Sequence, residues 1–347
     1  MLTEKQIKEI REHLKIAQNP IFFYDNDEDG LCSYVLLRKY IGAGSGVAVK
    51  SYPGLDESYF RKVNELNADY IFILDKPIVE ESFFKESEKY NIPVVWIDHH
   101  DVDTSYKPKS VNYYNPVFNK KSNNEPTTYL SYQVSQRKED LWIAVTGCVA
   151  DHYLPEFYKD FQKQYPELSV KAKEPFEVYY NAEIGKVAKM LSFGLKDRTT
   201  NVVKMQKLLI KSKSPYDVLN EAKDNLTIHK RYNEIMEKYE ILLKNAKEAG
   251  NQAGKILFFK FGGDLSIASY LSSEVGFNFK DKIVVIAHNK GEYLNMSIRG
   301  KNVRKILLET LKDFEGATGG GHPNAVGSKI KKEDWERFNK IFEKNSH

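Results

Sequence analysis

The chain has 347 residues, and its 52 basic and 48 acidic side chains leave a formal net charge of only +4. The overall charge therefore gives no argument for nucleic-acid binding, and any positively charged binding surface must be confined to one part of the molecule. Hydrophobic residues make up 41% and charged residues 29% of the chain, which excludes a disordered protein. The length predicts two or three domains.

The two cysteines, Cys32 and Cys148, are too few for a disulfide scaffold, and we expect both to be buried thiols. The N-terminal segment is charged and has helical spacing, unlike a signal peptide. No apolar run approaches the ~18 residues that a membrane span needs. These features predict a cytoplasmic protein that does not bind a membrane.

Helices and short strands alternate in the first part of the chain. Apolar residues at helical spacing predict a helix over residues 3–18. Three short apolar runs follow, and they end at Asp25, Asp75 and Asp98. Such runs between helical stretches predict a parallel sheet buried on both faces, whose carboxyl edge is the usual ligand site.

The sequence pattern changes twice in the second part of the chain. Residues 141–151 are an apolar helix or strand that ends at Asp151, and residues 155–250 have charged, helical spacing. Beyond the glycines at 250–254, the patterns indicate strands over 255–261, 282–290 and 292–300, and helices over 264–276, 302–313 and 331–345, with a glycine-rich turn at 316–327. The predicted fold class is α/β, with a parallel-sheet domain at 1–155, a helical connector at 156–250 and a smaller α/β domain at 251–347.

Carboxylates and histidines accumulate where the predicted strands end. Buried carboxylates without cations would cost several kcal/mol each, and the usual solution is a metal. Each segment alone has a plainer interpretation: the first acidic run fits a surface turn or a calcium loop, although the glutamate of an EF-hand is missing. Their joint occurrence favours a metal centre, built from Asp25, Asp27, Asp29, Asp75, Asp98, His99, His100 and Asp151.

The order of these motifs resembles that of a known family. The motifs are DNDEDG, an aspartate after an apolar strand, DHH, GCVAD and a closing GGGHPNAVG. This order resembles the DHH phosphoesterase superfamily, and within it the RecJ-like single-strand nucleases of the compact archaeal type, since no β-rich OB-fold insertion is visible. The resemblance implies a catalytic DHH domain followed by a DHH-associated domain that grips the substrate.

The resemblance also implies two divalent ions, with Mn as the first expectation and Mg as the alternative. Carboxylates would hold both ions, and an imidazole would also hold the second ion. A single carboxylate would bridge the two ions. The first ion is assigned to Asp25 and Asp27, the second to Asp29, His99 and Asp151, and the bridge to Asp75. Two such ions would stabilise charge on the attacking and leaving oxygens of a phosphate displacement.

Two further residues of the DHH motif receive roles from the resemblance. His100 would contact the scissile phosphate, and Asp98 would orient a histidine. Two positions depart from the family pattern. Phe23 stands where the histidine-type first motif begins, and Lys76 adds a positive charge beside Asp75.

A second group of residues suits phosphate binding. Ser297 and Arg299 alternate on a predicted strand and therefore face the same side. Consecutive glycines expose backbone N–H groups to an anion. The candidate substrate-binding residues are Ser297, Arg299, Gly319, Gly320, Gly321 and His322.

The leading interpretation is a metal-dependent exonuclease that acts on single-stranded DNA or RNA in repair or replication and releases nucleoside monophosphates. One alternative is a phosphodiesterase of short oligoribonucleotides or cyclic dinucleotides, and another is a non-catalytic repair or replication scaffold. The expected partners are single-stranded nucleic acid and a repair or replication protein such as a helicase. The sequence leaves the oligomeric state open. Thr127 and Thr128 are weaker candidates for the mouth of the site.

Overall fold

The structure is a computed structural model that describes residues 1–50, 54–101, 110–119 and 124–346. The chain divides into two compact units, Met1–Tyr232 and Asn233–His347. The predicted boundaries at 155 and 250 stay predictions, but the helices that follow residue 155 pack on the core of the first unit up to Ile228. Among the described residues, no helix is both long and apolar enough to cross a membrane.

The first unit is built on a five-stranded sheet in the order β2-β1-β3-β4-β5, and every neighbouring pair is parallel. This arrangement confirms the predicted parallel sheet. The three predicted strands are the central ones, and the two edge strands were not predicted. The strands are β1 (Pro20–Asp25), β2 (Ser45–Val49), β3 (Tyr70–Leu74), β4 (Val94–Ile97) and β5 (Val111–Tyr114).

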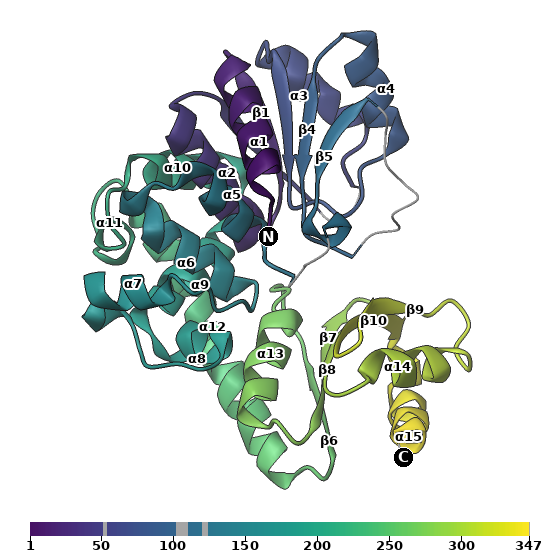
Figure 1. Cartoon of the computed structure of the whole chain (residues 1–347). Coiled ribbons are helices and arrows are strands. Elements are labelled where there is room, and N and C mark those ends of the chain that lie inside the picture. The colour runs from purple at the N-terminus through teal and green to yellow at the C-terminus, as the bar shows by residue number, and fades with distance from the viewer. Residues whose placement is uncertain (51–53, 102–109, 120–123, 347) are drawn as a thin grey trace. The chain divides into compact units, whose positions relative to one another are not determined.

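Helices cover both faces of this sheet (Figure 1). Thr3 is the N-cap of the first helix, and the side chains of Thr3 and Gln6 cap each other's backbone N–H groups. The helices are α1 (Glu4–Ile16), α2 (Glu28–Ile41), α3 (Phe60–Glu65), α4 (Glu81–Lys89), α5 (Thr127–Ser135), α6 (Leu141–Ala150), α7 (Tyr158–Gln164), α8 (Pro175–Asn181), α9 (Glu183–Leu195), α10 (Thr199–Lys211) and α11 (Tyr216–Leu219), with short 3-10 turns at Glu57–Tyr59, Pro116–Phe118, Lys138–Asp140 and Pro166–Leu168.

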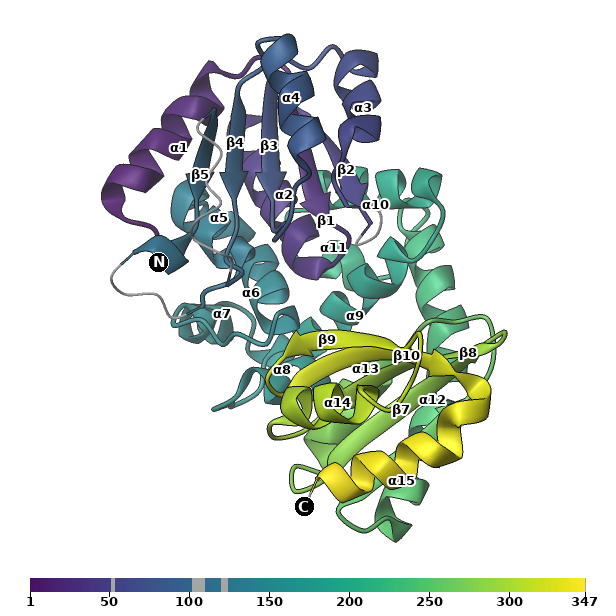
Figure 2. The same ribbon diagram turned by 90° about the vertical axis from the view of Figure 1, so that its right-hand side faces the viewer.

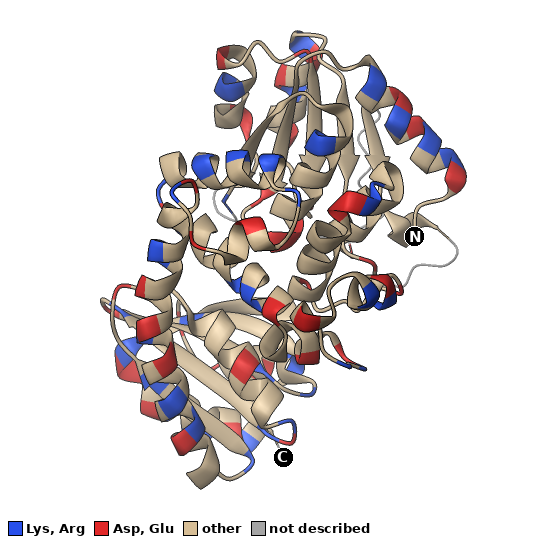
Figure 3. Ribbon diagram, turned by 90° about the vertical axis from the view of Figure 1, so that its left-hand side faces the viewer, with Lys and Arg blue, Asp and Glu red and all other residues tan. Residues whose placement is uncertain are grey.

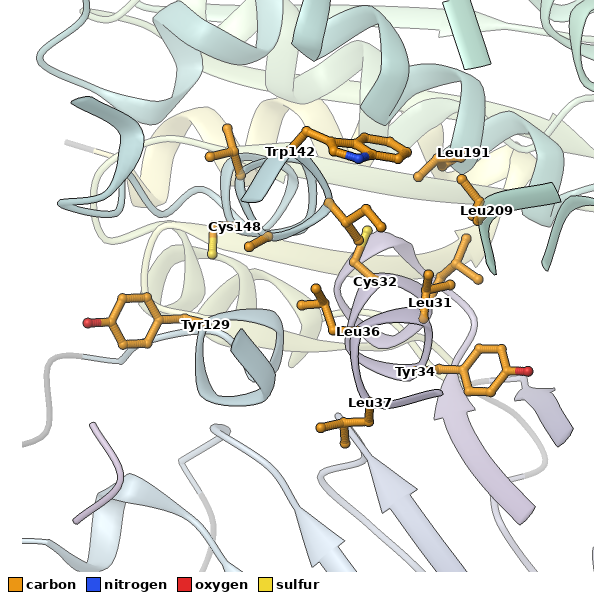
Figure 4. Packing of buried hydrophobic residues seen from close by; sticks show 14 of the residues in the cluster. Leu31, Cys32, Tyr34, Leu36, Leu37, Tyr129, Trp142, Cys148, Leu191 and Leu209 are labelled. Atoms are coloured by element: carbon orange, nitrogen blue, oxygen red, sulfur yellow. The ribbon is translucent and has the colours of Figure 1, made fainter. Parts of the chain in front are cut away.

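Successive side chains of the central strands enter different cores. Phe22 and Phe72 lie in the larger core with α2, α5, α6 and α9, whereas Phe23 and Ile73 lie in the smaller core with α3 and α4. This alternation is why these strands read as continuous apolar runs. The larger core also contains Cys32 and Cys148, which are free and buried as expected (Figure 4).

The second unit has a mixed five-stranded sheet in the order β6-β7-β8-β10-β9, in which only β6 and β7 are parallel. Figure 2 shows α14 and α15 on one face of this sheet and α13 on the other. Its elements are the end of α12 (Leu226–Gln252), β6 (Ile256–Phe261), α13 (Ala268–Asn278), β7 (Ile283–Lys290), β8 (Tyr293–Arg299), α14 (Val303–Leu311), β9 (Thr318–His322), β10 (Ala325–Lys331), a 3-10 turn at Lys332–Asp334 and α15 (Trp335–Asn345).

Candidate metal centre

Three adjacent strands deliver aspartates to one edge of the first sheet. Asp25 is the last residue of β1, and Asp75 and Asp98 directly follow β3 and β4. The backbone N–H of Asp75 bonds to the carbonyl of Ile97 at 2.9 Å, which keeps it level with the end of β4. Asp75 has a φ of 60°, a left-handed conformation that is costly for an aspartate. This strained residue lies at the centre of the acidic cluster.

The start of α2 brings two more carboxylates to the same edge. Asp27 is the N-cap of α2 and accepts a hydrogen bond from the N–H of Gly30 at 2.9 Å. A side chain at Gly30 would lie 2.4 Å from the carbonyl oxygen of Asp25, so glycine allows α2 to begin directly against β1. Asp29, in the first turn, is almost fully buried.

Helix α5 holds Asp29 in place through its N-terminal backbone. The N–H groups of Thr127 and Thr128 donate to the two carboxylate oxygens of Asp29 at 2.8 and 2.7 Å. The hydroxyl of Thr127 also donates to Asp75 Oδ1 at 3.2 Å. The two threonines thus support the acidic cluster rather than line a mouth. A carboxylate oxygen has more than one lone pair, so Asp29 can still accept a further partner.

His99 connects the carboxylates. Its Nε2 lies 3.4 Å from Asp75 Oδ1, 3.8 Å from Asp29 Oδ2 and 3.7 Å from Asp151 Oδ2. Asp151 directly follows α6, the apolar segment that the sequence left open between helix and strand. Each of three sets has ligand atoms that all lie within 4.8 Å of one another, so each could hold one ion. These sets are Asp25, Asp27 and Asp75; Asp29, His99 and Asp151; and Asp75, His99 and His100.

His100 is held by a fully buried aspartate. Its Nδ1 lies 2.8 Å from Asp98 Oδ1, while Tyr113 and Asn115 donate to Asp98 Oδ2 at 3.2 and 3.3 Å. Asn115 also donates to the carbonyl of His100 at 2.9 Å. The histidine that Asp98 contacts is thus His100. Tyr113 and Asn115 were missed, because they carry no motif and because the edge strand that contains Tyr113 and precedes Asn115 was not predicted.

A lysine enters the acidic cluster. The ammonium of Lys76 lies 2.8 Å from Asp25 Oδ1, and its side chain is only 5% exposed. The indole N–H of Trp96 donates to the carbonyl of Lys76 at 2.9 Å and fixes the backbone there. The local positive charge expected from the sequence is therefore directed at a candidate metal ligand.

Burial and crowding favour protonated carboxyls in this cluster. Burial and the nearby charges of Asp25 and Asp29 raise the pKa of Asp27 to about 8. Burial, together with Asp29 and Asp27, raises the pKa values of Asp75 and Asp151 well above their usual range. For His100, burial lowers the pKa, but the hydrogen bond and charge of Asp98, together with the charges of Asp29 and Asp27, raise the pKa overall. A divalent cation would stabilise the ionised form of carboxyl groups that repel one another in this way. The carboxylate oxygens and the neighbouring imidazole nitrogens are ligands that suit Mn or Mg.

The six candidate substrate-binding residues of the second unit lie on neighbouring strands. Ser297 on β8 is in register with Gly327 on β10 and Gly320 on β9, and the next row on the same face contains Arg299, Ala325 and His322. Arg299 is held by hydroxyls: it donates to Ser297, Ser269 and Ser273 at 3.0, 3.0 and 3.2 Å. The predicted alignment of Ser297 and Arg299 on one side of a strand is therefore correct.

The chain does reverse within the predicted turn at 316–327, but the three consecutive glycines do not form the reversal. Gly319, Gly320 and Gly321 belong to strand β9, and the chain reverses between β9 and β10 at residues 323–324. Close packing explains two of them, since a side chain at Gly319 would lie 2.8 Å from Leu311 and one at Gly321 would lie 2.6 Å from the carbonyl of Ala325. A side chain at Gly320 would meet nothing within 4 Å, so the face of β9 is open at this position.

Comparisons with known proteins agree with this architecture. The DHHA1 domain family matches residues 252–346. A RecJ from Thermus thermophilus in complex with Mn²⁺ is similar in structure with a TM-score of 0.67 and 13% identity, over 98% of this chain and 53% of the other. An exonuclease RecJ bound to manganese is similar with a TM-score of 0.63 and 14% identity, over 97% of this chain and 92% of the other.

A third similar structure is a pGpG-specific phosphodiesterase from Vibrio cholerae, with a TM-score of 0.53 and 14% identity over 95% of this chain and 99% of the other. No curated protein matches the sequence. The chain spans only about half the length of the Thermus protein. At these identities the comparisons show a shared fold.

Proposed function

We propose that this chain, which has the RecJ-like fold of the DHH phosphoesterase superfamily and a DHHA1 domain, is a metal-dependent exonuclease. It would hydrolyse phosphodiester bonds of single-stranded DNA or RNA to nucleoside monophosphates, in DNA repair or replication. The observation that carries this proposal is the convergence of three candidate ion sites on Asp75 and His99. Adjacent sites that share a ligand are typical of phosphoryl-transfer enzymes.

The residues that would hold the two ions are Asp25, Asp27 and Asp75 for one and Asp29, His99 and Asp151 for the other, with Mn as the proposed metal. Bound there, a divalent cation would polarise the phosphate and lower the pKa of a water molecule. The chain itself contributes orientation: Thr127 and Thr128 fix Asp29, and Ile97 fixes the backbone of Asp75. The carboxylates are therefore preorganised and do not need to move when the reaction occurs.

His100 is suited to contact the substrate. Its side chain is 26% exposed, compared with 8% for His99. Because Nδ1 is bonded to Asp98, the other ring nitrogen is available for a phosphate oxygen. Asp98 holds the imidazole in one orientation and stabilises its protonated form, in which it can offset negative charge on the phosphate or give a proton to the leaving oxygen.

The polar face of the second unit supports a phosphate-containing substrate. The guanidinium of Arg299 is oriented by hydrogen bonds to three serine hydroxyls. A planar guanidinium matches the geometry of phosphate oxygens. Gly320 lies in the same row two strands away from Ser297, and its open position leaves room there for a backbone or a phosphate. These features favour a phosphodiester over a small uncharged substrate.

A second candidate function is hydrolysis of short oligoribonucleotides or dinucleotides. The similarity to a pGpG-specific phosphodiesterase favours it, because that enzyme shares the fold over nearly its whole length. The two functions differ in substrate length. An exonuclease shortens long strands step by step, whereas a dinucleotide enzyme stalls on them.

The test is digestion of single-stranded DNA and RNA of about 20 nucleotides, labelled at either end, and of a labelled dinucleotide, with Mn or Mg. Asp75→Ala, purified in parallel, is the control for contaminating nucleases. Release of mononucleotides from long strands by the wild type alone supports the exonuclease. Cleavage of the dinucleotide alone supports the second function, and no cleavage above Asp75→Ala contradicts both and favours a scaffold.

A further inference from the structure

The first unit has a groove along the free edge of its sheet. Strand β2 is an edge strand, bonded to β1 on one side only. A cavity of about 610 Å³ lies between β2 and helix α10. Its lining includes Asn26, which separates Asp25 from Asp27, and the last residue of β2, Val49, is in register with Asp25. The groove therefore reaches the loop that carries the candidate metal ligands.

Glycine allows a tyrosine to pack directly on this edge strand. A side chain at Gly46 would lie 2.5 Å from the ring of Tyr34, which extends from α2 on the side opposite Tyr129 (Figure 4). On the other side, Gln206 from α10 donates to the hydroxyl of Tyr24 at 2.5 Å and weakly to the carbonyl of Gly46 at 3.4 Å. These contacts set the distance between β2 and α10 and so define the floor of the groove.

Accessible apolar side chains line its walls. Val47 and Ala48 from β2 and Val203 and Ile210 from α10 are all half-buried and border the cavity. Pockets of roughly 300–1,000 Å³ accommodate ligands of the size of a nucleotide or dinucleotide, and apolar walls suit flat bases. The shape and lining thus fit one or two nucleotides.

The rim of the groove is basic. Arg38, Lys50, Lys62 and Lys207 border it, against one acidic residue, Asp197. The carboxylate of Asp197 already accepts hydrogen bonds from the backbone N–H of Arg198 at 2.7 Å and from the side-chain amide of Asn201 at 2.8 Å. Lys62 pairs with Glu65, but among the described residues neither Lys50 nor Lys207 forms an ion pair. The groove therefore offers positive charge to an anionic ligand.

We propose that this groove binds the nucleotides of a single strand that adjoin the scissile phosphate. Their bases would lie against the apolar walls, and their phosphates would contact Lys50 and Lys207. This inference rests on the proposed function, because it assigns the path of the substrate that the candidate metal centre would cleave. It also gives a chain of nearly neutral net charge a local site for a polyanion, since four basic side chains border this groove against one acidic side chain.

Salt dependence of binding tests the proposal. Affinity for a fluorescent single strand of about 12 nucleotides would be measured by anisotropy in EDTA between 50 and 200 mM salt. Each lost phosphate contact reduces the slope of log K against log salt by about 0.7 for single strands, so Lys50→Ala with Lys207→Ala should reduce it by about 1.4 and weaken binding about tenfold. Lys204→Ala is the matched control, because Lys204 is exposed on α10 but does not border this groove.

A second variant tests the cavity without changing charge. Val203→Trp should fill the groove and raise KM for long strands severalfold while leaving the melting temperature within a few degrees of the wild type. If both variants bind as the wild type does, the groove is not the substrate path. If the lysine variants weaken binding but the wild type cleaves nothing, the groove is confirmed as a binding site and the proposed function fails. If the wild type cleaves long strands and the variants are unaffected, the proposed function stands and the groove is overturned.

Discussion

Lys76 gives the acidic cluster a cation of its own. Its ammonium contacts an oxygen of Asp25 in a buried setting, where a charge acts over short distances with little screening. The same position would repel a divalent ion at the set formed by Asp25, Asp27 and Asp75. Lys76 should therefore weaken one of the candidate ion sites relative to the others.

Lys76→Met is expected to tighten Mn²⁺ binding at the weaker site by about tenfold, or about 1.4 kcal/mol. Isothermal titration calorimetry of metal-free protein measures this change directly. Lys85→Met is the control, since Lys85 is an exposed partner of Glu81 on α4. Without metal, Lys76→Met should also be less stable than the wild type, because it leaves the Asp25 carboxylate without its cation. Unchanged Mn²⁺ affinity in Lys76→Met would show that the lysine does not compete with the ion.

Asp98 acts on the substrate only through His100. Asp98→Asn keeps the size of the side chain but removes the charge that orients and protonates the imidazole. We expect kcat to fall by about 10²–10³, in the range typical of general acid–base groups, with Mn²⁺ affinity changed less than threefold. Tyr113→Phe, which removes one of the donors to Asp98, should cost much less. A loss of Mn²⁺ binding that matches the loss of activity would instead assign Asp98 to the metal.

At the level of elements, the position of Asp151 depends on how closely α6 packs. This helix is buried on every side, and a side chain at Gly147 would lie 2.3 Å from Thr128 Oγ1 and 2.8 Å from Cys32 Cβ. The glycine of the GCVAD motif thus lets α6 approach α2 and α5, four residues before Asp151. Cys32 and Cys148 lie near this contact (Figure 4), and burial raises the pKa of both thiols.

Gly147→Ala should destabilise the protein by about 1–3 kcal/mol, the usual cost of overpacking. Because α5 also positions Asp29, the substitution should weaken Mn²⁺ binding as well. Chemical denaturation and calorimetry measure the two effects. Gly54→Ala is the control, since a side chain there meets nothing within 4 Å. Equal stability of the two variants would mean that α6 can shift without cost.

The sequence predicted the central strands and the residues at their ends for a physical reason. These strands are buried on both faces, so each is a continuous apolar run that stops at an aspartate. The edge strands β2 and β5 have no such run, since β2 is half-exposed and contains Gly46, and β5 has an exposed Asn112. Tyr113 and Asn115 could not be predicted for this reason. The glycines of β9 resemble a turn in sequence, because the reason for two of them, the packing of Gly319 on α14 and of Gly321 on β10, is visible only in the folded chain.

At the level of the whole molecule, charge is distributed rather than concentrated. Figure 3 shows basic and acidic residues interspersed along the helices of both units. The net charge of +4 includes the carboxylates of the acidic cluster, all counted as ionised. Since burial and mutual repulsion raise the pKa values of several of them, the metal-free protein binds protons there at neutral pH. Metal binding must therefore release protons.

This linkage predicts how the stability of the metal-free protein depends on pH. Asp27 has a pKa of about 8 in the folded chain and a usual value of 3.8, so between these values the unfolded chain loses a proton that the folded chain keeps. The free energy of unfolding in EDTA should therefore be highest in mild acid and fall as the pH rises from about 5 to 8. Mn²⁺ replaces the protons, so the increase in melting temperature that it causes should grow over the same range.

Differential scanning calorimetry at several pH values, with EDTA or with Mn²⁺, measures both trends. Asp27→Asn is the informative variant, because asparagine can still cap α2 through the N–H of Gly30 but cannot ionise. In EDTA this variant should be more stable than the wild type at pH 8 and should lose less stability between pH 5 and pH 8. It should also respond more weakly to Mn²⁺. A wild-type stability in EDTA that rises from pH 5 to pH 8 would contradict the crowding of buried carboxyls on which the metal centre is argued.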